Sequence, residues 1–139
     1  MFLFLLFLFA CGAKDTLPPI KVKNLEGEDF YLPQLKGKKT LIYVWSRTCA
    51  GHSRDLRLLN SLQEKGTYRV VSYAVAMEIQ DVKKSYQELG IKPKFLTLVD
   101  TEVKFNEYFS ITFLPSTYLF DERGKLVGSY AGLPEELTR

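Results

Sequence analysis

The fold is decided by residues 40–65, TLIYVWSRTCAGHSRDLRLLNSLQEK. Residues 40–45 are aliphatic, aromatic or β-branched, which is typical of a central strand buried on both faces. From Cys49 onward, leucines recur at helical spacing until Gly66 ends the pattern. We therefore predict a buried strand that leads through a short polar link into an amphipathic helix, with Cys49 in the first turn of that helix.

The residues on either side of this stretch predict an α/β protein. Upstream, residues 20–22 and 30–32 flank a turn and suit a short hairpin. Downstream we expect a strand, a helix, a strand, a helix and a terminal hairpin, over residues 68–77, 81–89, 95–99, 102–109 and 116–130. This order predicts a mixed sheet flanked by helices. The last residues, 133–139, begin a helix and give it barely one turn.

The N-terminal residues predict export. Residues 1–10 are continuously apolar; they are shorter than the about 20 residues of a spanning helix and suit the hydrophobic region of a signal peptide. The run ends at Leu8-Phe9-Ala10-Cys11, which resembles a bacterial lipobox, where the peptide is cut before the cysteine and that cysteine is acylated. No Lys or Arg precedes the run, and an ordinary signal peptide or an uncleaved anchor are the alternatives. We expect a signal peptide at 1–10, a tether at 11–19 and one domain at 20–139.

Size, charge and cysteine content narrow the function. A length of 139 residues fits one domain with a single core. The net charge of +3 comes without a run of Lys or Arg, so the sequence lacks the electrostatic footprint of a nucleic-acid-binding protein. The chain has two cysteines, and if Cys11 carries lipid, Cys49 is the only free thiol. An unpaired cysteine in an oxidising compartment indicates reactivity or ligation.

Three motifs carry a resemblance to a known family. Residues 44–52, VWSRTCAGH, resemble the active-site segment of membrane-anchored bacterial thioredoxin-like proteins of the TlpA/ResA type, in which Cys-x-x-Cys opens a helix. Residues 32–38, LPQLKGK, are similar to the family's lead-in, and residues 113–124, FLPSTYLFDERG, resemble its cis-proline strand and Asp-x-x-Gly turn. The match covers about residues 17–132. It implies a thioredoxin-like fold with an N-terminal hairpin extension and a short or missing final helix.

Two positions depart from the family pattern. His52 replaces the second cysteine, and Tyr43 stands where the family often has an acidic or amide residue. At a helix N-terminus, unpaired N–H groups and the macrodipole favour the thiolate of Cys49. His52, three residues on, would stabilise that thiolate when protonated, and would accept a proton or bind a metal when neutral. A tolerated loss of the second cysteine is the alternative interpretation.

The resemblance implies thiol–disulfide chemistry, but the residues present allow only some of its reactions. With no resolving thiol in the chain, Cys49 can exchange, isomerise or trap disulfides, but cannot reduce a substrate alone. The resemblance also implies a cis bond between Leu114 and Pro115 that faces Cys49 across a substrate groove; an ordinary trans turn proline is the alternative. Trp45 flanks the site, either in the core or lining the groove. The implied partners are exported proteins with thiols or disulfides, such as cytochrome or copper-oxidase maturation clients, on the periplasmic side of a bacterial membrane.

Other functions stay open at this point. Thiolate, imidazole and thioether together suit copper, and Cys49, His52 and Met77 could supply one of each. Ser46 and Cys49 have the Thr-x-x-Cys spacing of peroxiredoxins, but Ile42 stands where that family has proline. A third possibility is a redox-inactive module that binds partners through the groove. We expect no cofactor for exchange, and copper for the alternative.

Overall fold

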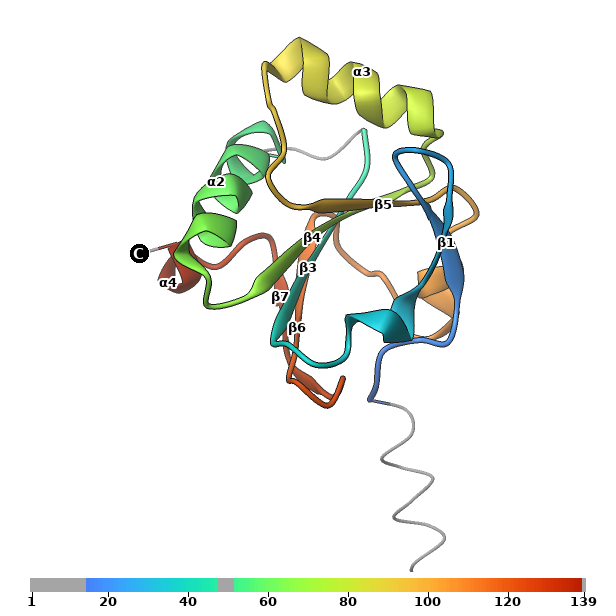
Figure 1. Cartoon of the computed structure of the whole chain (residues 1–139), viewed down its shortest axis with the longest axis vertical. Helices are drawn as coiled ribbons and strands as arrows, with labels where there is room; N and C mark the ends of the chain where they lie inside the picture. The colour runs from blue at the N-terminus through green and yellow to red at the C-terminus, as the bar shows by residue number, and fades with distance from the viewer. Residues whose placement is uncertain (1–14, 48–51, 139) are drawn as a thin grey trace, which may run out of the picture.

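The computed structural model describes residues 15–47 and 52–138. One seven-stranded sheet, in the order β2-β1-β5-β4-β3-β6-β7, organises these residues (Figure 1). The strands are β1 (Lys21–Asn24), β2 (Asp29–Tyr31), β3 (Thr40–Trp45), β4 (Arg69–Val75), β5 (Leu96–Asp100), β6 (Ser116–Phe120) and β7 (Leu126–Ala131). The helices are α2 (His52–Lys65), α3 (Ile79–Leu89) and the four-residue α4 (Glu135–Thr138), and the 3-10 turns are η1 (Leu32–Leu35) and η2 (Lys104–Glu107).

The sheet is mixed, as the sequence predicts. β3, β4 and β5 run parallel, while β6 is antiparallel to β3 and pairs with β7. On the other side, the β1–β2 hairpin joins β5 in antiparallel pairing. The thioredoxin-like fold, the N-terminal hairpin extension and the short final helix are therefore confirmed.

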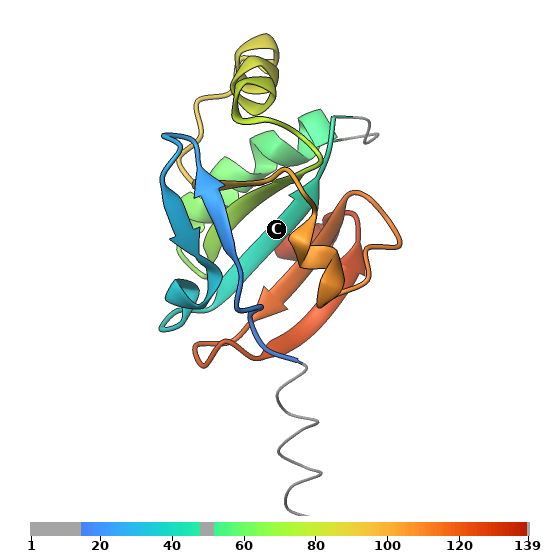
Figure 2. The same ribbon diagram turned by 90° about the vertical axis from the view of Figure 1, so that its right-hand side faces the viewer.

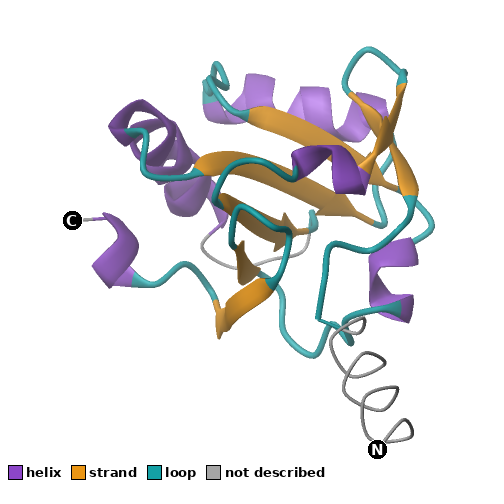
Figure 3. Ribbon diagram, turned by 60° about the horizontal axis from the view of Figure 1, so that its bottom comes forward, coloured by secondary structure: helices purple, strands orange, loops and turns teal. Residues whose placement is uncertain are grey.

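β3 is an interior strand that pairs with β4 on one side and β6 on the other, and all six of its side chains are buried. Leu41, Tyr43 and Trp45 point to the core that α2, α3 and α4 cover, and Ile42 and Val44 point to the core that η1 and η2 cover (Figures 1 and 3). Burying one large apolar side chain stabilises a fold by about 1.5–3 kcal/mol. Because β3 packs in both core layers, its carboxyl end is held in a fixed position.

Two predicted elements are shorter than expected. The helix predicted at 102–109 is only the 3-10 turn η2, because Val103 adopts a left-handed conformation and the Asp100 carboxylate accepts the N–H groups of Lys104 and Phe105, at 2.9 Å each. The strand predicted to reach residue 77 ends as β4 at Val75, because Ala76 turns the chain with φ of +57°.

The chain begins to pack against the domain at an earlier residue than predicted. Residues 15–19 belong to the predicted tether, yet Leu17 is 4 % exposed and packs in the core beside Val22. The apolar Leu17 side chain has more to gain from this core than from solvent. A free tether could therefore reach only to Asp15. Residues 1–10 and Cys11 lie outside the described residues, and within the described ranges no helix has the length and apolar character needed to cross a membrane.

Candidate active site

The carboxyl end of β3 and the start of β6 meet at one edge of the sheet. Val44 pairs with Ser116 in the antiparallel ladder, so Pro115, directly before β6, lies beside the end of β3. The Leu114–Pro115 peptide bond is cis, the configuration that the resemblance implies. Leu114 and Phe113 are 38 % and 64 % exposed and present apolar surface next to this proline. An extended partner could contact this surface.

Trp45 is held inside the core at this edge. Its side chain is fully buried, and its indole N–H donates to the Ser72 hydroxyl at 2.7 Å. The Tyr86 hydroxyl donates to the same oxygen at 2.8 Å and lies 2.9 Å from the Thr97 hydroxyl. Burial raises the pKa of Tyr86 to about 12, against the smaller lowering effect of these two hydroxyls. Of the two roles predicted for Trp45, the structure gives it the packing role.

A buried carboxylate lies under the site, and we did not predict it. Asp55, in the first turn of α2, is 3 % exposed and accepts a 2.6 Å hydrogen bond from the Tyr43 hydroxyl. Its other oxygen lies 3.4 Å from the Arg54 guanidinium, which is mostly exposed. Asp55 shares helical spacing with Leu59 and Leu62, so an acidic residue on the apolar face was the available signal. α2 supplies a carboxylate, and β3 supplies its phenol partner.

The segment between β3 and α2 carries the predicted thiol. Cys49 lies outside the described residues, as does the side chain of His52, the first residue of α2. The described link residue Arg47 forms an ion pair with Asp81 of α3, with 2.9 Å between Nη2 and Oδ2. This ion pair and the buried Trp45 fix where the chain leaves β3.

Met77 is separated from the solvent-exposed part of this edge. Its side chain is 2 % exposed within the core under α2 and α3, and its carbonyl accepts a hydrogen bond from the Thr101 hydroxyl at 2.7 Å. Among the described residues, no group of three or more His, Cys, Asp or Glu side chains could hold a metal ion. A thioether ligand from Met77 would have to leave the core first.

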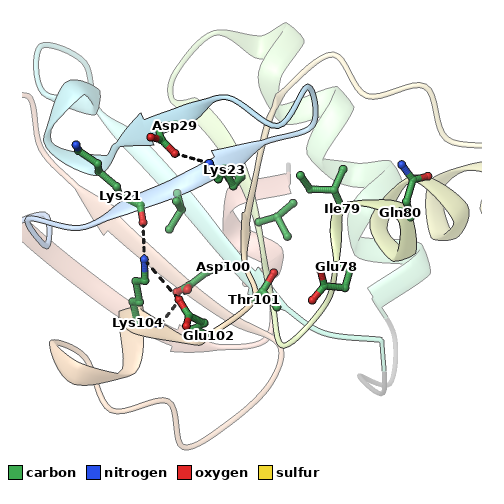
Figure 4. A pocket seen from close by; sticks show the side chains of 12 residues that line it. Lys21, Lys23, Asp29, Glu78, Ile79, Gln80, Asp100, Thr101, Glu102 and Lys104 are labelled. Atoms are coloured by element: carbon green, nitrogen blue, oxygen red, sulfur yellow. Dashed lines mark hydrogen bonds and ion pairs between the residues drawn. The ribbon is translucent and has the colours of Figure 1, made fainter.

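An open pocket lies away from this site, between β1, the start of α3 and the loop after β5 (Figure 4). Its charged side chains largely bind one another. Lys23 pairs with Asp29 at 2.6 Å, and the Lys104 ammonium lies 3.7 Å from the Glu102 carboxylate and donates to the Lys21 carbonyl at 3.3 Å. Because the pocket is lined by β1 and the end of β5, and β4 lies between β5 and β3, the pocket is separate from the candidate site at the end of β3.

Comparison with known proteins agrees with this arrangement. The chain is 29 % identical over 119 residues to the thiol-disulfide oxidoreductase ResA of Bacillus cereus, covering 83 % of this chain and 67 % of the relative. The structure is similar to a putative thiol:disulfide interchange protein DsbE from Chlorobium tepidum, with a TM-score of 0.78, 17 % identity and coverage of 90 % and 89 % of the two chains. It also resembles the exposed lipoprotein thioredoxin Etrx1 of Streptococcus pneumoniae, with a TM-score of 0.70, 25 % identity and coverage of 84 % and 91 %. The Redoxin family model matches residues 12–137, and the chain therefore belongs to the Redoxin family.

Proposed function

We propose that the protein is an exported, membrane-tethered thiol–disulfide exchange protein that acts through Cys49 alone. The observation that carries this proposal is the pairing of β3 with β6, because it brings the cis-proline edge beside the strand that leads to Cys49. The thiol-disulfide relatives support the same chemistry.

The exchange step follows from having one thiol. The Cys49 thiolate attacks one sulfur of a partner's disulfide, a new Cys49–partner disulfide forms, and the partner's other sulfur leaves as a thiolate. No electrons are gained or lost overall. Release then needs a second thiol, supplied by the partner itself or by a small external thiol, because His52 stands where a resolving cysteine would attack. A partner with its own nearby thiol is therefore isomerised, whereas one without it stays bound.

The surroundings of the site fit a nucleophilic thiolate. A carboxylate at Asp55 lies one helical turn after His52, where residues three apart are neighbours on a helix. A protonated imidazole at His52 would favour the thiolate of Cys49. Exposed Phe113 and Leu114 would hold the apolar side chains of an extended partner.

Non-reducing electrophoresis of cell extracts tests the proposal. The wild-type protein should give high-mass species that disappear when thiol is added, and Cys49→Ser should abolish them. Cys11→Ser is the matched control, because it removes the other cysteine and should leave the species in place. His52→Cys should convert them to free protein by supplying an internal resolving thiol. Absence of the species from the wild type, together with no gain of reductase activity in His52→Cys, would remove the basis for exchange.

Tethering through Cys11 forms a separate part of the proposal. The lipobox-like residues before Cys11 and the structural relative described as an exposed lipoprotein support it. Cys11→Ser should move the protein out of the detergent phase in a phase-partition assay or block its processing. Unchanged partition of this variant would contradict lipidation.

Copper binding is the competing function, through Cys49 and His52. The buried position of Met77 leaves these two as the ligands to test. Titration of the reduced protein with Cu(I) should show no stoichiometric uptake if exchange is the function. Tight uptake that is lost in both Cys49→Ser and His52→Ala would favour copper delivery instead. If exchange and copper uptake both fail, a partner-binding module without redox activity is the remaining function.

A further inference from the structure

The start of the described chain fixes which end of the domain faces its attachment point. The Leu126 N–H donates to the Asp15 carbonyl at 2.7 Å, and the Leu17 N–H donates to the Gly124 carbonyl at 2.9 Å. Figure 2 shows this start beside the β6–β7 turn, at the lower end of the view. The four residues from Cys11 to Asp15 span at most about 14 Å. An attachment at or before Cys11 therefore holds this end of the domain close to the membrane.

Three turns gather at this end. They are residues 36–39 before β3, residues 66–68 between α2 and β4 together with the flanking Lys65 and Arg69, and residues 121–125 between β6 and β7. The Gly37 N–H donates to the Glu122 carbonyl and the Arg69 N–H donates to the Lys39 carbonyl, both at 2.8 Å. We call the surface formed by Asp15 and these three turns the basal surface.

The basal surface carries the positive charge of the protein. Its basic residues are Lys36, Lys38, Lys39, Lys65, Arg69, Arg123 and Lys125, all exposed except the half-buried Arg69. Its acidic residues are Asp15, Asp121 and Glu122. The chain has 19 basic and 16 acidic residues, so the remaining 12 basic and 13 acidic residues nearly cancel. The basal surface therefore has a net charge of +4, and the rest of the chain has a net charge of −1.

These basic side chains are also available to a partner. None of the seven forms an ion pair with another described residue, whereas the ion pairs of the described chain involve basic residues elsewhere, such as Arg47 and Lys104. The Asp121 carboxylate accepts the backbone N–H groups of Arg123 and Lys125, at 2.9 Å each. That carboxylate stabilises the turn and is less able to neutralise the lysines around it.

We infer that the basal surface docks on the anionic phospholipid headgroups of the membrane to which the chain is tethered. The inference rests on the proposed tether, which brings this surface within reach of the lipid. Basic residues near an anionic bilayer are attracted to it within about one Debye length, and each raises binding roughly fivefold. Docking gives the domain a fixed orientation.

This orientation points the candidate site away from the membrane. β3 begins at the basal surface with Thr40 and ends at the site with Trp45 (Figure 2). Six residues of strand span about 20 Å. The Leu114–Pro115 edge would thus face the proteins of the compartment, and a tether only a few residues long would still leave the site accessible.

Lysine acetylation of the full-length protein, isolated from membranes and reconstituted into vesicles, tests the inference. One set of vesicles contains phosphatidylcholine only, and the other contains added phosphatidylglycerol. Lys36, Lys38, Lys39, Lys65 and Lys125 should react at least threefold more slowly in the anionic vesicles. Lys83 and Lys84, exposed on α3, should react equally in both sets and serve as internal controls. High salt should remove the protection, because it shortens the Debye length.

Paired charge reversals separate a local surface from a general charge effect. Lys38→Glu with Lys39→Glu should reduce the protection of Lys36, Lys65 and Lys125 to the level in neutral vesicles. Lys83→Glu with Lys84→Glu changes the net charge equally and should leave that protection intact. Equal acetylation of the basal lysines in both vesicle types, or equal effects of the two reversals, would overturn the docking. Flotation with neutral vesicles reports the tether by itself, so loss of flotation counts against the tether and not against the basal surface.

Discussion

Replacing Tyr43 by Phe would remove one hydroxyl, and with it the 2.6 Å hydrogen bond that the phenol donates to the buried Asp55 carboxylate. The ring would still fill its place in the core. Asp55 would keep only the 3.4 Å contact with the exposed Arg54 guanidinium among its described contacts. A hydrogen bond to a charged group contributes about 1.5–3 kcal/mol, and a buried charge that loses its main partner falls in the upper part of that range. We expect the free energy of unfolding to fall by about 2–3 kcal/mol.

The fold contains its own matched control. Tyr73 donates to the buried Asp100 carboxylate at 2.7 Å, and burial together with that carboxylate raises the pKa of Tyr73, so the phenol remains a donor. Asp100 also accepts two backbone N–H groups, from Lys104 and Phe105. Tyr73→Phe therefore leaves a carboxylate that still has two donors, and we expect a smaller loss of about 1–1.5 kcal/mol.

Urea unfolding at pH 7, followed by the fluorescence of the single Trp45, measures both losses. With a slope of about 2 kcal/mol per molar urea, the Tyr43→Phe midpoint should fall by about 1 M. Adding Asp55→Asn to Tyr43→Phe should recover part of the loss, because a buried amide costs less than a buried carboxylate. Equal losses for Tyr43→Phe and Tyr73→Phe, or no recovery in the double variant, would refute the reasoning.

Further predictions concern the core and the turns. Ser72→Ala removes an acceptor shared by two buried aromatic side chains and should cost about 1–3 kcal/mol in thermal unfolding; an unchanged Tm would contradict this. Because the pKa of Tyr86 is raised from 10.0 to about 12 in the folded state, its stabilisation is complete below pH 10 and is lost, by about 3 kcal/mol, as pH rises through 12. Urea titrations between pH 10 and pH 12 should show a shallower decline in the free energy of unfolding for Tyr86→Phe than for the wild type. An identical decline would show that Tyr86 is not its cause. Gly124 and Gly27 both have positive φ. A Cβ at Gly124 would lie 3.2 Å from the Leu17 side chain, whereas a Cβ at Gly27 would have no neighbouring atom within 4 Å. Gly124→Ala should therefore cost about 2–3 kcal/mol and Gly27→Ala about 1 kcal/mol by urea unfolding, and equal costs would show that Leu17 yields freely.

The regular elements could be predicted because the type and spacing of their residues indicate which side chains are buried. The six residues of β3 are aliphatic, aromatic or β-branched, and the structure buries both faces of that strand. The leucine spacing of α2 and the turn of the β1–β2 hairpin were equally direct. These patterns depend on neighbours in sequence, and they therefore predicted the order of the elements along the chain.

What could not be predicted depends on contacts between distant residues. The spacing of Asp55 with Leu59 indicated an acidic residue on an apolar face, but not that Tyr43, twelve positions earlier, would satisfy it. The helix expected at 102–109 failed for a similar reason. Val103 takes a left-handed conformation and Phe105 is fully buried, so tertiary packing overrides the local helical pattern.

The central claim is that Cys49 exchanges disulfides without a resolving thiol, and intact-mass spectrometry tests it most directly. The reduced, purified full-length protein is mixed with an excess of a disulfide-linked dimer of a peptide that has a single cysteine, so that the leaving thiol departs with the second peptide, and its mass is followed over time. We predict one peptide adduct per wild-type chain at Cys49, stable until an external thiol is added, and only transient adduct in His52→Cys as an internal disulfide forms. A wild-type protein that gains no adduct, or that loses it without any added thiol, would contradict the claim.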